Sequence, residues 1–194
     1  MKNKSKKSNN SLLEGGKYSA IEIARLLLSY DPKREYFKDG KMSLRTDETN
    51  PTIGNFRLNK MLHICYMLYY AKYGKPLFWE NLRAYPKGAL VYKILMNFFQ
   101  LCKEKLETWQ ISVEEEDERF VNKAYCYFKN NSDQELEDFS HSDISWKERR
   151  RKIMNELVSL KEMREDDDRM IVDEKAKNFY RDILRHKVKE VGLN

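Results

Sequence analysis

The sequence has few of the residues that break helices or form cross-links. Its 194 residues include 7 glycines, 4 prolines and 3 cysteines. Scarce turn-forming residues favour long helices over a β architecture with many turns. Cys65, Cys102 and Cys126 are odd in number and form no C-x-x-C pair, which does not fit the disulfide framework of a secreted protein. Each lies among apolar residues, so we expect all three to be small core side chains.

Long hydrophobic runs are also missing. The longest, residues 61–71, is interrupted by His63 and flanked by Lys60 and Lys72, whereas a membrane-spanning helix needs about 20 apolar residues. The basic start, Met1–Lys7, is not followed by the apolar segment of a signal peptide. We therefore expect a cytoplasmic protein with no membrane partner.

The sequence motifs of several common catalytic sites are absent. It contains no G-x-x-x-x-G-K-[ST], G-x-G-x-x-G, H-E-x-x-H or G-x-S-x-G segment. His63, His141 and His186 are far apart, and no local pair has the spacing of zinc ligands. We therefore expect no enzyme activity, catalytic residue, metal or cofactor. A hydrolase whose Cys–His pair forms only in the fold is the last-ranked alternative.

Charge of one sign does not dominate the chain. The net charge is +6, but 31 acidic residues lie among 37 basic ones, as is typical of a soluble surface. The lysine-rich start and the basic run Arg149–Lys152 permit contact with nucleic acid. The run is followed by Glu156 and Glu162, and no motif that reads a DNA groove is recognisable. A nucleic-acid-binding regulatory protein therefore remains the alternative function.

The residues that are present are sufficient for one packed domain. Hydrophobic residues make up 41% of the chain and aromatic residues 12%. We predict a mainly α fold, a helical bundle of about six to seven helices with at most a short two-stranded β element. Residues 1–17 are predicted to be a disordered basic leader and residues 18–194 the domain. Within the domain, residues 31–55 read as an irregular loop or insertion, and residues 173–194 as a terminal helix.

Local patterns place the helices. Capping boxes, in which a serine is followed three residues later by a glutamate, predict helix starts at Ser19, Ser132 and Ser145. Residues 58–73 are apolar on most sides, which predicts a helix at the centre of the bundle. Further helices are expected over residues 90–101 and 114–131, and short strands over residues 82–85 and 108–113. Predicted inward positions of the last two helices are Trp146, Ile153, Leu157, Leu160, Ala176, Phe179, Tyr180, Ile183, Leu184 and Val188.

Two segments have candidate functional residues. Residues 74–88 combine a helix stop, an extended stretch and a glycine turn, which is typical of an architectural connection or of a partner-binding surface. Residues 139–146 form a polar corner between two helices, where His141 either bonds to the corner or faces a partner. The corner role is the favoured interpretation of His141.

Four segments, in order, resemble the Panacea domain of SocA-like antitoxins. Tyr18–Ala24 resembles the family's opening Y-S-A-x-E-I-A, and Leu58–Leu62 is similar to the central L-x-K-L-L-Y helix. Gly74–Tyr85 resembles G-K-P-L-F-x-E-x-I-x-A-W, and Phe139–Trp146 resembles the L-T-H…P-W corner. The resemblance covers about residues 18–160. Departures include Gly88-Ala89-Leu90 in place of G-P-V, Tyr85 in place of tryptophan, Ser140 in place of threonine, and Ser145 in place of proline.

The resemblance implies a protein that neutralises a cognate toxin by direct binding and does not catalyse a reaction. On this interpretation the toxin is the main partner, while a homo-oligomer and nucleic acid stay open. The candidate partner-binding residues are Phe78, Tyr85, Lys87, Gly88, His141 and Trp146.

Overall fold

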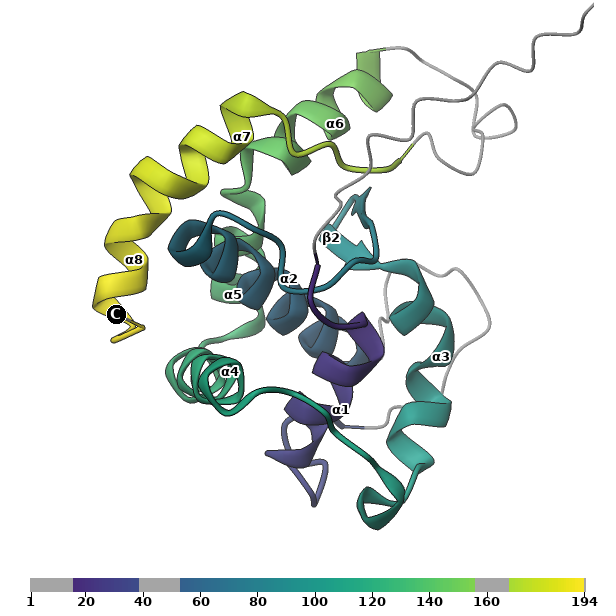
Figure 1. Cartoon of the computed structure of the whole chain (residues 1–194). Coiled ribbons are helices and arrows are strands. Elements are labelled where there is room, and N and C mark those ends of the chain that lie inside the picture. Colours follow the sequence, from purple (N-terminus) through teal and green to yellow (C-terminus); the bar gives the residue numbers. More distant parts are fainter. Residues whose placement is uncertain (1–15, 39–52, 156–167, 194) are drawn as a thin grey trace, which may run out of the picture.

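A computed structural model describes residues 16–38, 53–155 and 168–193 of the chain (Figure 1). Over these residues the fold is mainly helical with one two-stranded sheet, which confirms the predicted fold class. Most of the predicted leader, the greater part of the predicted 31–55 loop, and Leu157 and Leu160 lie outside the described residues. The elements are α1 (Ala20–Ser29), α2 (Ile53–Tyr73), β1 (Leu82–Tyr85), β2 (Gly88–Val91), α3 (Tyr92–Lys103), η1 (Leu106–Thr108), α4 (Glu115–Phe128), α5 (Asp133–His141), α6 (Ile144–Asn155), α7 (Glu174–Asn178), η2 (Phe179–Leu184) and α8 (Arg185–Glu190).

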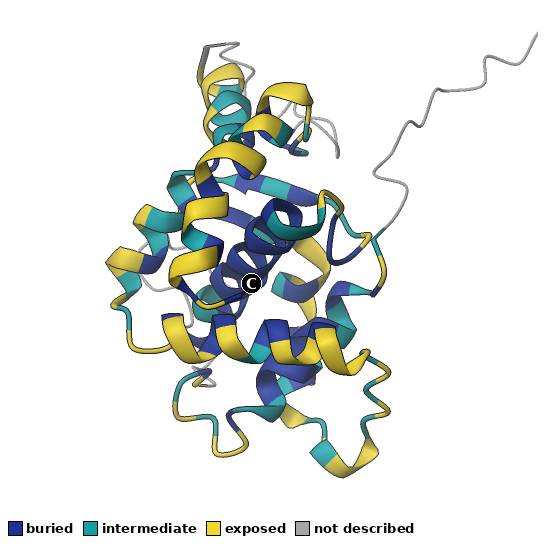
Figure 2. Ribbon diagram, turned by 60° about the vertical axis from the view of Figure 1, so that its left-hand side comes forward, coloured by how far each residue is buried: buried dark blue, intermediate teal, exposed yellow. Residues whose placement is uncertain are grey.

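Helix α2 is the centre of the fold, as its apolar sequence predicts. It contacts α1, α3, α4, α5, α8 and β2, which surround it in Figure 1. From Leu58 to Ala71 every residue is buried, and the helix is dark throughout its middle in Figure 2. Its buried side chains include the polar residues Asn59, Lys60 and His63. Because buried polar groups require hydrogen-bond partners, other elements must supply partners to α2 at these three residues.

Two of the three predicted capping boxes are confirmed. The side chains of Ser19 and Ser132 each accept a hydrogen bond from the backbone N–H of the glutamate three residues later, and that glutamate binds back. The box at Ser145 is wrong, because α6 begins one residue earlier, at Ile144. Asp143 precedes this helix, and its carboxylate accepts the Ser145 N–H at 2.8 Å. The carboxylate therefore takes the capping role, and the Ser145 hydroxyl instead lies 3.0 Å from the Tyr180 hydroxyl.

The start of α4 is tied to the N-terminal segment through a buried carboxylate. Asp117 accepts hydrogen bonds from the hydroxyls of Tyr18 at 2.7 Å and Tyr69 at 3.0 Å. Lys17 also binds it, with its amine 2.8 Å away. Burial opposes the charged form, but the three hydrogen bonds outweigh burial and lower the pKa of Asp117. Lys17 therefore belongs to the packed structure, although it lies within the predicted leader.

The sheet is a hairpin in which β1 pairs antiparallel to β2. Tyr85 lies opposite Gly88, so the turn consists of Pro86 and Lys87. The predicted strand over residues 82–85 is confirmed. The predicted strand over residues 108–113 is wrong, because no strand occurs there and the second strand is Gly88–Val91, next to the first. The outer edge of β1 also pairs with residues 168–170 through two backbone hydrogen bonds.

The terminal helix begins as predicted and then changes its pitch. The Asp173 side chain accepts the Ala176 N–H at 2.9 Å and caps the helix. Residues 179–184 form a π-helical segment, which has more residues per turn than an α-helix. The buried positions accordingly recur every four residues, at 176, 180, 184 and 188. Ile183 is 61% exposed, so its predicted inward orientation is wrong.

The cysteine prediction holds for one residue of the three. Cys65 is buried in α2, whereas Cys102 is only partly buried and Cys126 is exposed. The inward side of α4 is occupied mainly by other apolar residues, and Cys126 lies on the outer side. None of the helices in the described ranges is long and apolar enough to cross a membrane.

Candidate partner-binding surface

Both candidate segments meet at one place in the fold. The hairpin lies against α2, the end of α5 contacts β2, and the start of α6 contacts β1. The hairpin turn and the α5–α6 corner are therefore neighbours, although more than 50 residues separate them in the sequence. We call Tyr85, Lys87, Gly88, His141 and Trp146 the turn–corner surface.

Side chains of α2 hold the hairpin from beneath. The Asn59 side-chain oxygen accepts the Val91 N–H at 3.0 Å, at the end of β2. The Lys60 amine donates to the Lys87 carbonyl in the turn and lies 3.5 Å from the Ser140 hydroxyl. One helix thus binds both ends of β2, and the position of the turn is set by the core.

A buried hydrogen-bond chain runs below the same corner. One ring nitrogen of His63, Nδ1, lies 2.9 Å from the Ser140 hydroxyl, and the other, Nε2, lies 2.7 Å from the Asp143 carboxylate. The Tyr180 hydroxyl also donates to Asp143, at 2.9 Å. His63, Ser140 and Asp143 have no exposed surface. We interpret this chain as a connection between α2, the α5–α6 corner and the terminal helix, because every polar group in it is used internally.

Two aromatic rings form the corner. The rings of His141 and Trp146 are stacked, with centroids 4.0 Å apart and planes 8° apart. The Trp146 indole N–H donates to the Tyr85 carbonyl at 2.9 Å, so the stack is attached to the hairpin. The Nε2 atom of His141 lies 3.8 Å from a Glu137 oxygen and has no hydrogen bond within the described residues. This geometry accommodates the corner role of His141 and leaves part of the ring exposed.

The local environment disfavours positive charge. Burial lowers the pKa of the Lys60 amine to about 7, and the more distant Glu137 only partly offsets the effect. Burial also lowers the pKa of His141, and the nearby Lys60 lowers it further. At neutral pH a large fraction of Lys60 is therefore uncharged, and His141 is mostly neutral.

Gly88 is required by the geometry of the turn. Its φ is +104°, in a region that side chains other than glycine rarely adopt. A Cβ atom at this position would overlap the Lys60 amine and lie 2.6 Å from the Ser140 hydroxyl. The absence of a side chain therefore allows the turn to approach α2 and α5.

The structure brings together five of the six predicted site residues. Lys87 is exposed, Tyr85, His141 and Trp146 are half-buried, and Gly88 is buried beneath the turn. Phe78 has no exposed surface and packs on Tyr66, with ring centroids 5.2 Å apart. Phe78 therefore serves the core and offers no contact surface in this structure.

The sequence prediction did not include the residues that support this surface. Lys60, His63 and Asp143 were not singled out as partners, because 77 or more residues separate α2 from the corner. A usable signal was present: Asn59 and Lys60 lie about one helical turn before His63, and residues 58–71 are otherwise apolar. Such an arrangement indicates buried polar groups that need distant partners.

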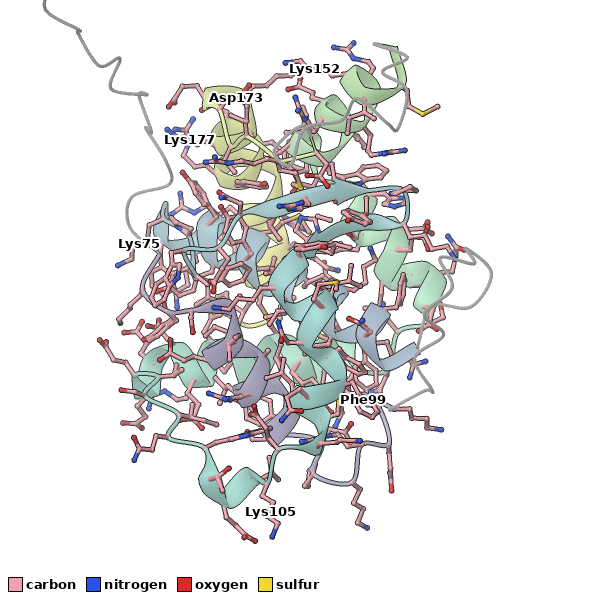
Figure 3. All side chains as sticks on the ribbon, turned by 90° about the vertical axis from the view of Figure 1, so that its right-hand side faces the viewer. Lys75, Phe99, Lys105, Lys152, Asp173 and Lys177 are labelled. Atoms are coloured by element: carbon pink, nitrogen blue, oxygen red, sulfur yellow. The ribbon has the colours of Figure 1, made fainter. Side chains whose placement is uncertain are left out.

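The basic run does not form one continuous surface. Arg151 and Lys152 are exposed, whereas Arg149 and Arg150 are partly buried, and Lys152 lies at the end of α6 in Figure 3. Arg150 lies 3.4 Å from the Ala84 carbonyl and so contacts the hairpin. Helical periodicity thus divides the four basic residues between partly buried and exposed positions.

Comparison with known families agrees with the resemblance seen in the motifs. The family model described as "Antitoxin SocA-like, Panacea domain" matches residues 58–147. This stretch of the chain is similar to that domain. The Panacea match begins within α2 and ends in the first turn of α6, so it includes the hairpin, the turn–corner surface and the Lys60–His63 support. Three of the four resembling segments lie inside the match, and Tyr18–Ala24 lies before it. Neither the curated proteins nor the solved structures contain a match to the chain.

Proposed function

We propose that the protein is an antitoxin, which neutralises a cognate toxin protein by binding it directly. The observation that carries this proposal is the match of residues 58–147 to the SocA-like Panacea domain. On this proposal the protein acts in the cytoplasm, and its activity is stoichiometric binding without turnover of a substrate.

We further propose that the turn–corner surface contacts the toxin. Tyr85 and Trp146 are half-buried residues of the types enriched at protein interfaces, and the half-buried ring of His141 and the exposed amine of Lys87 lie beside them. Hydrogen bonds between the backbone of the hairpin and the side chains of Asn59, Lys60 and Trp146 fix the main chain below these side chains. A surface that is already ordered loses less conformational entropy on binding.

The function is tested by co-expression with the product of each neighbouring gene that inhibits growth. We expect rescue of growth and a complex that co-purifies with the antitoxin. If the protein rescues growth from no adjacent reading frame, the antitoxin proposal is wrong.

The proposed toxin contact at the turn–corner surface is tested with Tyr85→Ala and Lys87→Ala. Both replacements leave the backbone groups that bind Lys60 and Trp146 in place, so we expect loss of rescue with an unchanged melting temperature. Lys75→Ala is the matched control, because Lys75 is also exposed and lies before β1, outside the turn–corner surface (Figure 3). Full rescue by both turn variants would place the toxin contact elsewhere on the molecule.

A further inference from the structure

The outer face of α3 exposes large apolar side chains. Tyr92, Met96 and Phe99 are 39%, 53% and 38% exposed, respectively. Their spacing of four and three residues places them on one side of the helix. The opposite side carries Ile94, Phe98 and Leu101, which are buried in the core. In Figure 3 this helix lies toward the viewer, with Phe99 in its lower half.

Basic groups lie at both ends of this apolar stripe. The Arg83 guanidinium stacks on Tyr92 at 4.6 Å from the ring centroid, and the Lys103 amine lies 3.7 Å from the centroid of Phe99. Lys93 is an exposed cation near the first end, where the Arg83 side chain is only 19% exposed. Helix α3 itself contains no acidic residue. The stripe is therefore an apolar surface in a basic setting.

Nearby carboxylates only partly compensate these charges. Arg83 lies 3.6 Å from an oxygen of Asp168, and Lys93 lies 3.8 Å from an oxygen of Glu80. Both distances are longer than those of strong charge-assisted hydrogen bonds. Cations that stack on aromatic rings keep their charge, and it can still attract an incoming anion.

The spacing of these groups fits a helix as the partner. Lys93 and Lys103 are separated by about 15 Å along the axis, since each residue of an α-helix advances about 1.5 Å. An amphipathic helix that packs along α3 would place apolar residues of positions i, i+3 or i+4, and i+7 on Tyr92, Met96 and Phe99. Acidic residues on its flanks would then meet the basic groups. A second copy of this chain fits poorly, because its own α3 would bring lysines against lysines.

We propose that the outer face of α3 is a docking surface for an acidic amphipathic helix of a partner protein. This surface is separate from the turn–corner surface, and the proposal does not depend on the antitoxin function.

The proposal is tested with a synthetic probe and the full chain. The probe is a fluorescein-labelled helical peptide with leucine at positions i, i+4, i+7 and i+11 and glutamate on both flanks, and its control has lysine in place of every glutamate. Fluorescence anisotropy should show saturable binding of the glutamate peptide that weakens with salt. The lysine peptide should bind at least about tenfold more weakly, which corresponds to about 1.4 kcal/mol.

Variants locate the binding. Met96→Glu places a carboxylate in the centre of the stripe and should weaken binding of the glutamate peptide about tenfold or more. Met154→Glu is the matched control, because Met154 is a methionine on α6 that is 66% exposed, and it should leave binding unchanged. Circular dichroism melting checks that both variants fold.

Four results would overturn the proposal: no saturable binding of the glutamate peptide, equal binding of both peptides, unchanged binding by folded Met96→Glu, or equal weakening by Met154→Glu. Sedimentation of the wild type alone provides an independent check. A dimer that Met96→Glu abolishes would assign the face to a second copy, and the partner-helix proposal would then be wrong.

Discussion

Replacing Lys60 with methionine should stabilise the protein at acidic pH and have little effect at alkaline pH. Lys60 is 3% exposed, and its nearest polar contacts are the Lys87 carbonyl and the Ser140 hydroxyl, neither of which has a negative charge. Burial without a close carboxylate disfavours the ammonium form, which lowers the pKa of Lys60 to about 7. Methionine is similar in length and has no charge to bury.

The change in the free energy of unfolding caused by Lys60→Met is the difference between two opposing effects. A pKa lowered from 10.5 to about 7 corresponds to about 5 kcal/mol against folding when the amine is charged in both states. Methionine removes this penalty but leaves the carbonyl and the hydroxyl without their donor, which costs about 1–3 kcal/mol. At pH 6 the variant should therefore be more stable than the wild type by about 2–4 kcal/mol.

The sign of the pH dependence follows from proton binding. Between pH 7 and about 10.5 the unfolded chain keeps the Lys60 proton while the folded chain has lost it, so the contribution of Lys60 to wild-type stability becomes less unfavourable as pH rises. Below pH 7 both states bind the proton, and the full penalty is present. The advantage of the variant should fall by about 3 kcal/mol from pH 6 to pH 9.

Urea denaturation followed by circular dichroism at pH 6, 7.5 and 9 measures this difference. Other titrating groups are shared by the two proteins and cancel in the comparison, except His141, whose pKa is lowered by the nearby Lys60 and should therefore rise in the variant. Lys75→Met is the control, because Lys75 is exposed and its replacement should show no such trend. If the difference between Lys60→Met and the wild type is the same at every pH, the argument that burial lowers the pKa of Lys60 is refuted.

Three further substitutions test other contacts. Gly88→Ala should destabilise the protein by about 1–3 kcal/mol, because it forces an alanine to positive φ and displaces the Lys60 amine, and thermal melting would measure the loss. Asp117→Asn should cost about 1–3 kcal/mol at pH 7 and less at pH 3, because the stabilisation by a carboxylate of lowered pKa is lost as pH falls; unchanged stability at pH 7 would contradict this reading. Trp146→Phe keeps the aromatic ring but removes the donor to the Tyr85 carbonyl, so urea denaturation should show a loss of about 1 kcal/mol.

The parts of the fold that depend on local sequence could be predicted. The boxes at Ser19 and Ser132 are complete within four residues, and the apolar surface of α2 is visible in its composition alone. The box at Ser145 failed because Asp143 is a competing capping residue two positions earlier. The predicted inward orientation of Ile183 was wrong because the π-helical segment has a different number of residues per turn from the α-helix that the prediction assumed.

The candidate surface could be predicted only in part. Tyr85, His141 and Trp146 lie within segments that resemble a known family, and Lys87 lies two residues beyond one of them, so these four residues could be predicted from the sequence. Their support was not, because Lys60 and His63 meet the turn and the corner only after the chain has folded around α2. A polar residue in an apolar helix indicates that it needs a partner, but the sequence of that helix does not identify which one.

The attachment of β2 at both ends has a consequence for how this surface can change. The side chains of Lys60 and Trp146 donate hydrogen bonds to backbone carbonyls of the hairpin, and the side chain of Asn59 accepts one from a backbone N–H. Side chains at positions 85 and 87 can therefore be exchanged while the course of the main chain stays the same. The backbone of the hairpin is therefore fixed while two of its side chains can vary. The binding specificity of this surface could be redesigned at positions 85 and 87 without redesigning the fold.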